Sequence, residues 1–221
     1  MRFQRARSDE QKEIRRKQIM KAAAELFKKY EYKDITLNMI AGKLDFSRAN
    51  MSRYVATKEE IFLLLYVEDM ILLTEELQKS YTKKMNYNEF ADFLVSISMS
   101  HTNFMRIGCI LSTIIENNIS VEKLVGYKKI MFEQAKKIVD VFVENFDFLS
   151  QEDGYYIMSI LTEYMSGLYL STNQTPLQKE AMKQCGFADH QKDFKTAMTE
   201  FIVLILHGYK ELYPAKGSKA K

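Results

Sequence analysis

Apolar residues recur along this chain at intervals of three and four, which is the spacing of one face of an α-helix. The first such stripe predicts a helix from Ile14 to Tyr30, and it consists of Ile19, Ala22, Ala23, Leu26, Phe27 and Tyr30. Only 2 prolines and 8 glycines interrupt the 221 residues, which disfavours a turn-rich β fold. The pattern therefore predicts an all-α protein.

Capping residues divide the remaining pattern into further helices. Ser, Thr and Pro at suitable positions mark the starts, because they satisfy or tolerate the free N–H groups of a first helical turn. Glu60, three residues after the expected cap Thr57, predicts a capping box. The expected helices cover 36–44, 47–55, 58–78, 89–105, 120–145, 151–170, 176–186 and 190–213, with a broken helical stretch at 108–118.

The two short helices at 36–44 and 47–55, joined by a tight turn, fit a helix-turn-helix unit. The second of them is poor in large apolar groups apart from Met51 and Val55. Its small and hydrogen-bonding side chains could enter a major groove, where arginine suits guanine and asparagine suits adenine. Flanking polar groups could hold phosphates. The candidate DNA-binding residues are Thr36, Ser47, Arg48, Ala49, Asn50, Ser52, Arg53, Tyr54 and Lys58.

The charge distribution supports this interpretation. Residues 1–58 carry 15 Lys/Arg against 7 Asp/Glu, a balance of +8, whereas residues 59–221 carry 17 against 22, a balance of −5. A basic N-terminal quarter on a mildly acidic remainder is typical of a head that binds a polyanion, although a solvated basic face would look the same. Residues 1–12 could form a flexible arm that adds non-specific DNA affinity, or they could equally be disordered and have no role.

The residues of this head resemble a known family. The run Ile19 to Phe27, followed by Tyr32, Ile35-Thr36, Ile40-Ala41, Phe46-Ser47 and Tyr54 to Glu59, is similar to the N-terminal domain of tetracycline-repressor (TetR) family transcriptional regulators. The resemblance implies a homodimer that binds a palindromic double-stranded DNA operator, a small-molecule effector and, in general, repression. It also implies that Lys58 contacts backbone phosphate.

Three residues depart from the family pattern. The family usually has glycine at the positions of Glu31 and Asp45, and tyrosine at that of Ser52. Aspartate tolerates a left-handed backbone better than glutamate does. The departures leave open an alternative: a helical small-molecule-binding or interaction module with a vestigial DNA-binding head.

The last helix is apolar on most sides, which predicts a second buried surface and hence a partner molecule, although a large monomeric core would also explain it. Small residues in the 151–170 helix would let another helix approach. The resemblance likewise implies that the last two long helices pair with those of a second copy. The expected interface contains Ser159, Ser166, Gly167, Met198, Phe201, Ile202, Ile205 and Tyr209.

Residues 59–221 are rich in methionine and aromatic side chains, which adapt to irregular apolar ligands but more often pack as core. The resemblance places an effector pocket among these helices. Candidate lining residues for an apolar or aromatic effector are Tyr66, Met70, Phe93, His101, Phe104, Met105, Arg106, Tyr127, Met131, Glu163, Tyr164 and Met165. Arg106 and Glu163 could orient a polar ligand group, pair with each other or face solvent.

The sequence contains no motif of a nucleotide-binding or hydrolytic enzyme, and its three histidines lack metal-ligand spacing, so we expect no enzyme activity, cofactor or metal. Two cysteines, the absence of a secretory signal and the absence of a membrane span suggest a cytoplasmic protein. The resemblance implies a bacterial protein that lies on the nucleoid when bound to DNA. The expected organisation is a DNA-binding domain at 1–58, an effector-binding and dimerisation domain at 59–213, and a disordered tail at 214–221.

Overall fold

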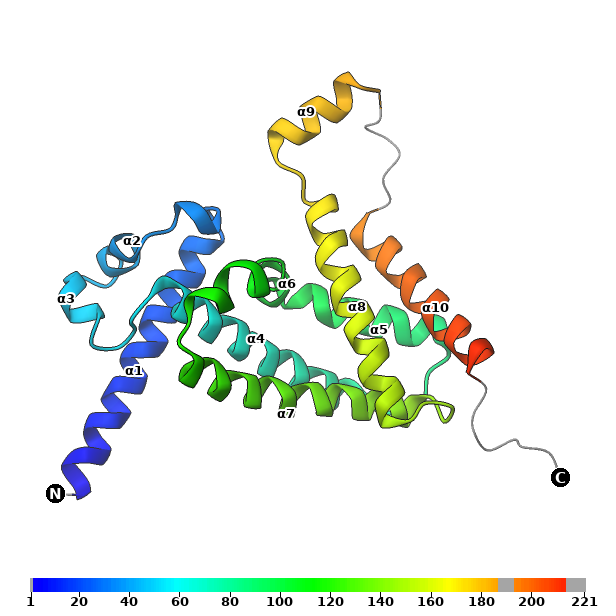
Figure 1. Ribbon diagram of the computed structural model, residues 1–221, viewed down its shortest axis with the longest axis horizontal. Helices are drawn as coiled ribbons and strands as arrows, with labels where there is room; N and C mark the ends of the chain where they lie inside the picture. Colours follow the sequence, from blue (N-terminus) through cyan, green and yellow to red (C-terminus); the bar gives the residue numbers. More distant parts are fainter. Residues whose placement is uncertain (1, 187–192, 214–221) are drawn as a thin grey trace. The chain divides into compact units, whose positions relative to one another are not determined.

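The computed structural model describes residues 2–186 and 193–213, and every regular element in these ranges is helical (Figure 1). The all-α prediction is thus confirmed. The predicted tail at 214–221 and the predicted start of the last helix at His190 lie outside the described residues.

The described chain divides into two compact units. The first contains residues 1–68 and 110–128, and the second contains residues 69–109 and 129–221. Helices α4 (Lys58–Ser80) and α7 (Val121–Asn145) each contribute residues to both units.

The first unit is built on α1 (Arg2–Phe27), a helix that extends back through the range expected to be a flexible arm. A 3-10 turn (η1, Tyr32–Asp34) leads to α2 (Leu37–Gly42) and α3 (Arg48–Met51). The buried stripe of α1 runs from Ile19 to Phe27, where the Phe27 ring meets Phe62 of α4 edge-on at 5.0 Å between centroids. This apolar core fixes the helix-turn-helix segment.

The α3 helix ends four residues earlier than the sequence predicts. After Met51 the chain forms a tight turn, because the Tyr54 N–H bonds the Met51 carbonyl at 2.9 Å in an i→i+3 pattern. Val55 N–H bonds the same carbonyl at 3.2 Å, so the segment still turns helically up to Val55.

The second unit contains α5 (Tyr87–Ser100), α6 (Thr102–Gly108), α8 (Gln151–Thr172), α9 (Pro176–Gln184) and α10 (Phe194–Leu212). Helix α10 packs against α5 and α8, and α6 packs against both of its neighbours α5 and α8. Ser150 and Asp153 form a complete capping box at the start of α8, and Thr175 with Gln178 does the same for α9.

The prediction of one continuous helix over 89–105 is wrong. The chain breaks at His101, whose φ of −104° and ψ of 64° are not helical, and α6 begins directly afterwards. The predicted broken stretch is confirmed as a π-helical turn (η2, Leu111–Ile115) and a 3-10 turn (η3, Glu116–Asn118).

Candidate nucleic-acid interface and helical body

Side-chain caps and one left-handed residue shape the helix-turn-helix. Thr36 caps α2 by accepting the Met39 N–H at 3.2 Å. Asp45 has a φ of +53°, which is the left-handed conformation that glycine would supply at this turn. Glu31, in contrast, is extended, with φ −69° and ψ 151°, so its position requires no glycine. The two glycine departures are therefore compatible with the helix-turn-helix geometry.

The hydroxyl groups of two predicted DNA-binding residues hold the α3 helix. Ser47 Oγ accepts the Asn50 N–H at 3.1 Å, which caps the helix, and Ser52 Oγ donates to the Ala49 carbonyl at 2.9 Å. Met51 and Val55 are buried beneath the helix. The opposite side of α3 is consequently left to polar and small residues.

The predicted DNA-binding positions are largely open to solvent. Thr36, Ser47, Ala49, Ser52 and Arg53 are exposed, whereas Asn50, Tyr54 and Lys58 are half-buried. The Arg48 side chain lies outside the described part of the structure. Contact with base edges requires accessible polar side chains of this kind.

Lys58 has structural partners that the sequence did not indicate. Its ammonium donates to the carbonyls of Tyr32 at 2.8 Å and Ile35 at 2.9 Å, and lies 3.9 Å from the Tyr32 ring centroid. Burial lowers the pKa of Lys58 from its ordinary value. Since an ammonium has three N–H donors, Lys58 secures η1 in front of α2 and retains one donor for another acceptor.

Tyr32 completes this arrangement. Its hydroxyl donates to Glu59 at 2.6 Å, and its ring packs edge-on against Phe62 at 4.9 Å. Burial raises the pKa of the Tyr32 hydroxyl, and the Glu59 carboxylate raises it further. The start of α4 is thus tied to the turn that precedes the helix-turn-helix.

The predicted capping box at Glu60 is only half correct. Thr57 Oγ1 accepts the Glu60 N–H at 3.1 Å, as expected, but Glu60 accepts the N–H of Ala56, one residue before the cap, at 2.8 Å. The other carboxylate oxygen accepts from Lys123 of α7 at 2.7 Å. Glu60 is 4% exposed. Its ion pair with Lys123 joins the first turn of α4 to the first turn of α7.

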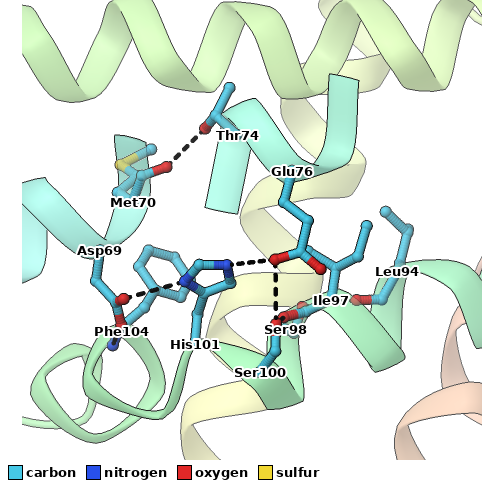
Figure 2. A network of polar contacts seen from close by, with 10 residues as sticks. All are labelled: Asp69, Met70, Thr74, Glu76, Leu94, Ile97, Ser98, Ser100, His101 and Phe104. Carbon is cyan, nitrogen blue, oxygen red and sulfur yellow. Dashed lines mark hydrogen bonds and ion pairs between the residues drawn. The ribbon is translucent and has the colours of Figure 1, made fainter. Parts of the chain in front are cut away.

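In the second unit, His101 lies between two carboxylates of α4 (Figure 2). Its Nδ1 is 3.0 Å from Asp69 Oδ1 and its Nε2 is 3.0 Å from Glu76 Oε2. The second oxygen of Asp69 accepts the Phe104 N–H at 2.7 Å and so satisfies the first turn of α6. These contacts explain the helix break, because Asp69 replaces the bonds that a continuous helix would make.

This His101 network was not predicted. The sequence pattern placed His101 and Phe104 among the pocket residues, but a carboxylate 32 positions earlier gives no local signal. Both ring nitrogens of His101 already face an acceptor within the protein, and the residue is 9% exposed.

The other pocket candidates are distributed over both units. Tyr66 and Tyr127 belong to the first, and the remaining ten belong to the second. Met70, Phe104, Met105 and Met165 are buried, as is Tyr66, where burial raises the hydroxyl pKa. Phe93, Arg106, Tyr127, Met131 and Tyr164 are half-buried, and Glu163 is exposed and bonded by the Ser159 hydroxyl at 3.3 Å.

A groove of about 510 Å³ opens elsewhere in the second unit. It is lined by the start of α5, the α7–α8 connection and Lys210 of α10, and none of its lining residues is a predicted pocket residue. Its wall includes the Tyr87 and Phe146 rings, which stack at 5.2 Å between centroids. Asn145 supports this wall by accepting the Met85 N–H at 2.8 Å and donating to the Met85 carbonyl at 3.1 Å.

The predicted interface residues divide into two groups. Met198 and Ile202 are buried within the protomer, whereas Ser159 and Gly167 are exposed, and Ser166, Phe201, Ile205 and Tyr209 are half-buried. Helices α8 and α10 also expose large apolar side chains outside the predicted interface set. The most exposed are Tyr156, Leu170, Leu204 and Leu212, with exposed fractions of 57–75%.

The described residues contain neither a candidate metal site nor a candidate membrane-spanning helix. In that part of the chain, no three or more His, Cys, Asp or Glu side chains are grouped so that they could hold a metal ion. No described helix is long and apolar enough to cross a membrane.

Comparisons with known proteins agree with the fold. A family model described as "Tetracyclin repressor-like, C-terminal domain" matches residues 68–211. No curated protein matches the chain. The solved structure of the fatty acid degradation regulator FadR from Bacillus halodurans is 15% identical and covers 93% of this chain and 97% of its own, with a TM-score of 0.55.

A transcriptional regulator of the TetR/AcrR family from Thermobifida fusca YX-ER1 is 18% identical, covers 93% of this chain and 99% of its own, and has a TM-score of 0.49. At these identities, the FadR structure supports the helical fold and no finer property. The family model covers well over half of the chain. The protein therefore belongs to the tetracycline-repressor-like family of transcriptional regulators, as the resemblance of its N-terminal residues predicted.

Proposed function

We propose that this family member is a homodimeric repressor that binds a palindromic operator through residues 1–58 and is released by a small apolar or aromatic molecule bound within residues 59–213. The observation that carries the proposal is the exposed polar side of α3, held over a buried Met51 and Val55 and next to a turn with intact left-handed geometry. The balance of +8 over residues 1–58 adds attraction for phosphate. Such a protein would act in the bacterial cytoplasm, on the nucleoid.

In this proposal α3 and the turn that follows it read base edges through Arg48, Asn50 and Arg53. Thr36 and Tyr54 hold the flanking phosphates, together with the remaining donor of Lys58. The caps formed by Ser47 and Ser52 fix the helix, and Ala49 lets it approach the groove closely. An effector would release the operator only if it binds the released conformation more tightly than the DNA-bound one.

DNA binding is tested by fluorescence anisotropy with duplex fragments from upstream of the protein's own gene, over a salt series. We expect one fragment to bind in the nanomolar range, with affinity falling steeply as salt rises. The Arg48→Ala/Asn50→Ala variant should lose preference for that fragment. The Lys79→Ala/Asn88→Ala variant removes similar groups from the exposed surface of the body and should keep it.

If no genomic fragment is preferred over any other, the repressor proposal fails, and a ligand-binding module with a vestigial head takes its place. If a preferred fragment is found, release of that fragment provides the screen for aromatic and alkyl effectors. A set of such compounds that binds the body without changing DNA affinity would contradict the proposed release mechanism.

The proposed dimer rests on the exposed apolar side chains of α8 and α10. Large apolar groups that remain exposed on two adjacent long helices favour association with a second copy. Leu204→Glu should therefore convert the dimer to monomers in analytical ultracentrifugation. Leu177→Glu on α9 is the matched control, because Leu177 is 80% exposed, compared with 68% for Leu204. Equal sedimentation of the two variants would refute this interface.

A further inference from the structure

The N-terminal part of α1 continues well beyond the core of its unit. Ile19 is the first of the described side chains in the helix to be buried, and every described side chain from Glu10 to Gln18 is exposed. Residues 2–18, here called the α1 extension, would span about 25 Å at 1.5 Å per residue. The described side chains of the extension lie outside the core of this unit.

The extension is strongly basic. It contains seven Lys/Arg and three Asp/Glu, a balance of +4 within 17 residues. At 100° per residue, positions 2, 5, 12 and 16, all Arg or Lys, fall within about 80° of one another. Asp9 shares this face, and the other two acidic residues, Glu10 and Glu13, lie towards its edge or beyond it. One face of the helix is thus predominantly cationic.

The extension leaves the core beside the segment that would read DNA. The Arg15 guanidinium lies 5.2 Å from the ring centroid of Phe46, in the turn between α2 and α3. Arg16 Nε donates to the carbonyl of Tyr54, just after α3, at 3.4 Å. A duplex docked on α3 therefore brings its phosphates next to the point from which the extension emerges.

The helix can extend because its nucleus already exists. An isolated helix of this length is marginal in water, since forming the first turn is costly. Here the buried segment Ile19–Phe27 supplies that turn, and each further residue adds one backbone hydrogen bond. Phosphate contacts along the cationic face would favour the helical form still further.

From these observations we propose that the cationic face of the α1 extension binds the phosphate backbone of the DNA that flanks each half-site. The inference rests on the DNA-binding function proposed above, and it adds a second, sequence-independent contact surface to it. A contact of about 25 Å corresponds to about seven base pairs at 3.4 Å per pair.

The test compares two charge-matched variants. Arg5→Gln/Lys12→Gln removes two charges from the cationic face. Arg7→Gln/Lys17→Gln removes the same residue types from positions that lie about 120–160° around the helix from Arg5 and Lys12. Both variants keep good helix formers, and circular dichroism should show equal helix content.

Each protein is titrated with the preferred duplex in a full-length form and in a form trimmed by seven base pairs at each end. For the cationic-face variant, the slope of log affinity against log salt should fall by about 0.9 for each phosphate that is no longer neutralised. Trimming should weaken the wild-type protein and the Arg7/Lys17 variant, and should leave the Arg5/Lys12 variant almost unchanged.

Equal salt slopes for the two variants, or an equal loss of affinity on trimming in all three proteins, would overturn the inference while leaving the operator-binding function intact. Failure of the wild-type protein to prefer any genomic fragment would overturn both.

Discussion

His101 allows a stringent test of whether the joint between α5 and α6 is structural or part of an effector site. Replacing it with alanine removes two contacts of 3.0 Å, one to Asp69 and one to Glu76. The side chains of His101 and Asp69 are 10% and 15% exposed, so water replaces little of the Asp69 contact. Glu76 is 45% exposed, so water can largely replace its contact.

The exposed fractions of these side chains determine how much stability the substitution removes. A hydrogen bond to a charged group that is shielded from water, such as Asp69, contributes about 1.5–3 kcal/mol to stability. The solvent-screened contact to Glu76 adds about 0.5 kcal/mol. We therefore expect His101→Ala to lower the free energy of unfolding by about 2–4 kcal/mol, including the packing of the ring. For a chain of this size, that corresponds to a fall in Tm of roughly 5–12 °C.

The assay is urea unfolding followed by circular dichroism, at one fixed protomer concentration because dimerisation would shift the midpoint. Asp69→Asn leaves one oxygen for two donors, His101 and the Phe104 N–H, and should cost about 1.5–3 kcal/mol. Glu76→Gln keeps an acceptor at an exposed site and should cost less than about 1 kcal/mol. The reasoning is refuted if His101→Ala and Glu76→Gln are equally stable, or if His101→Ala retains wild-type stability and loses only its response to an effector.

Substitutions at four further positions test single features. Asp45→Gly should raise stability by up to about 1 kcal/mol, because glycine adopts a φ of +53° without cost, whereas Asp45→Val should lower it; chemical unfolding gives both signs. Asn145→Ala should lower the free energy of unfolding by about 2–3 kcal/mol in the same assay, since the N–H and the carbonyl of Met85 both lose their hydrogen-bond partner. Gly154→Ala places a Cβ 2.6 Å from Val139 Cγ1, and the overpacking of about 1–3 kcal/mol should exceed the gain in helix propensity. At Gly167 no atom lies within 4 Å of an added Cβ, so Gly167→Ala should stabilise the protomer by about 0.5–1 kcal/mol, and a simultaneous loss of dimer in ultracentrifugation would place a second helix there.

Local signals in the sequence were sufficient for most of the helices. Caps such as Thr36, Ser47 and Ser150 act on a backbone N–H three residues ahead, so their effect can be predicted from neighbouring residues alone. The stripe from Ile19 to Phe27 identifies a buried face, because its residues return to the same side of a helix at each turn.

The same local reasoning missed contacts that depend on distant residues. No neighbouring residue indicates that two donors of Lys58 reach carbonyls 23 and 26 positions earlier. Met198 and Ile202 were assigned to a partner surface but are buried within the protomer, whereas Leu204 on the same helix is 68% exposed. Periodicity places residues on helix faces, but it does not say which face meets the protein's own core.

A polar residue within an apolar segment therefore has two explanations that sequence alone does not separate. His101 was grouped with the ligand-binding candidates, and a histidine among apolar residues needs a polar partner of some kind. In the structure that partner is α4, and the histidine marks the point where one apolar helix becomes two. Glu60 behaves in the same way, since its burial is balanced by Ala56 and Lys123 rather than by a ligand. In a chain built from long helices, the buried polar side chains that are satisfied within the protein identify the joints. A search for the effector site should therefore begin with half-buried side chains, such as Phe93, whose polar or aromatic surface remains accessible.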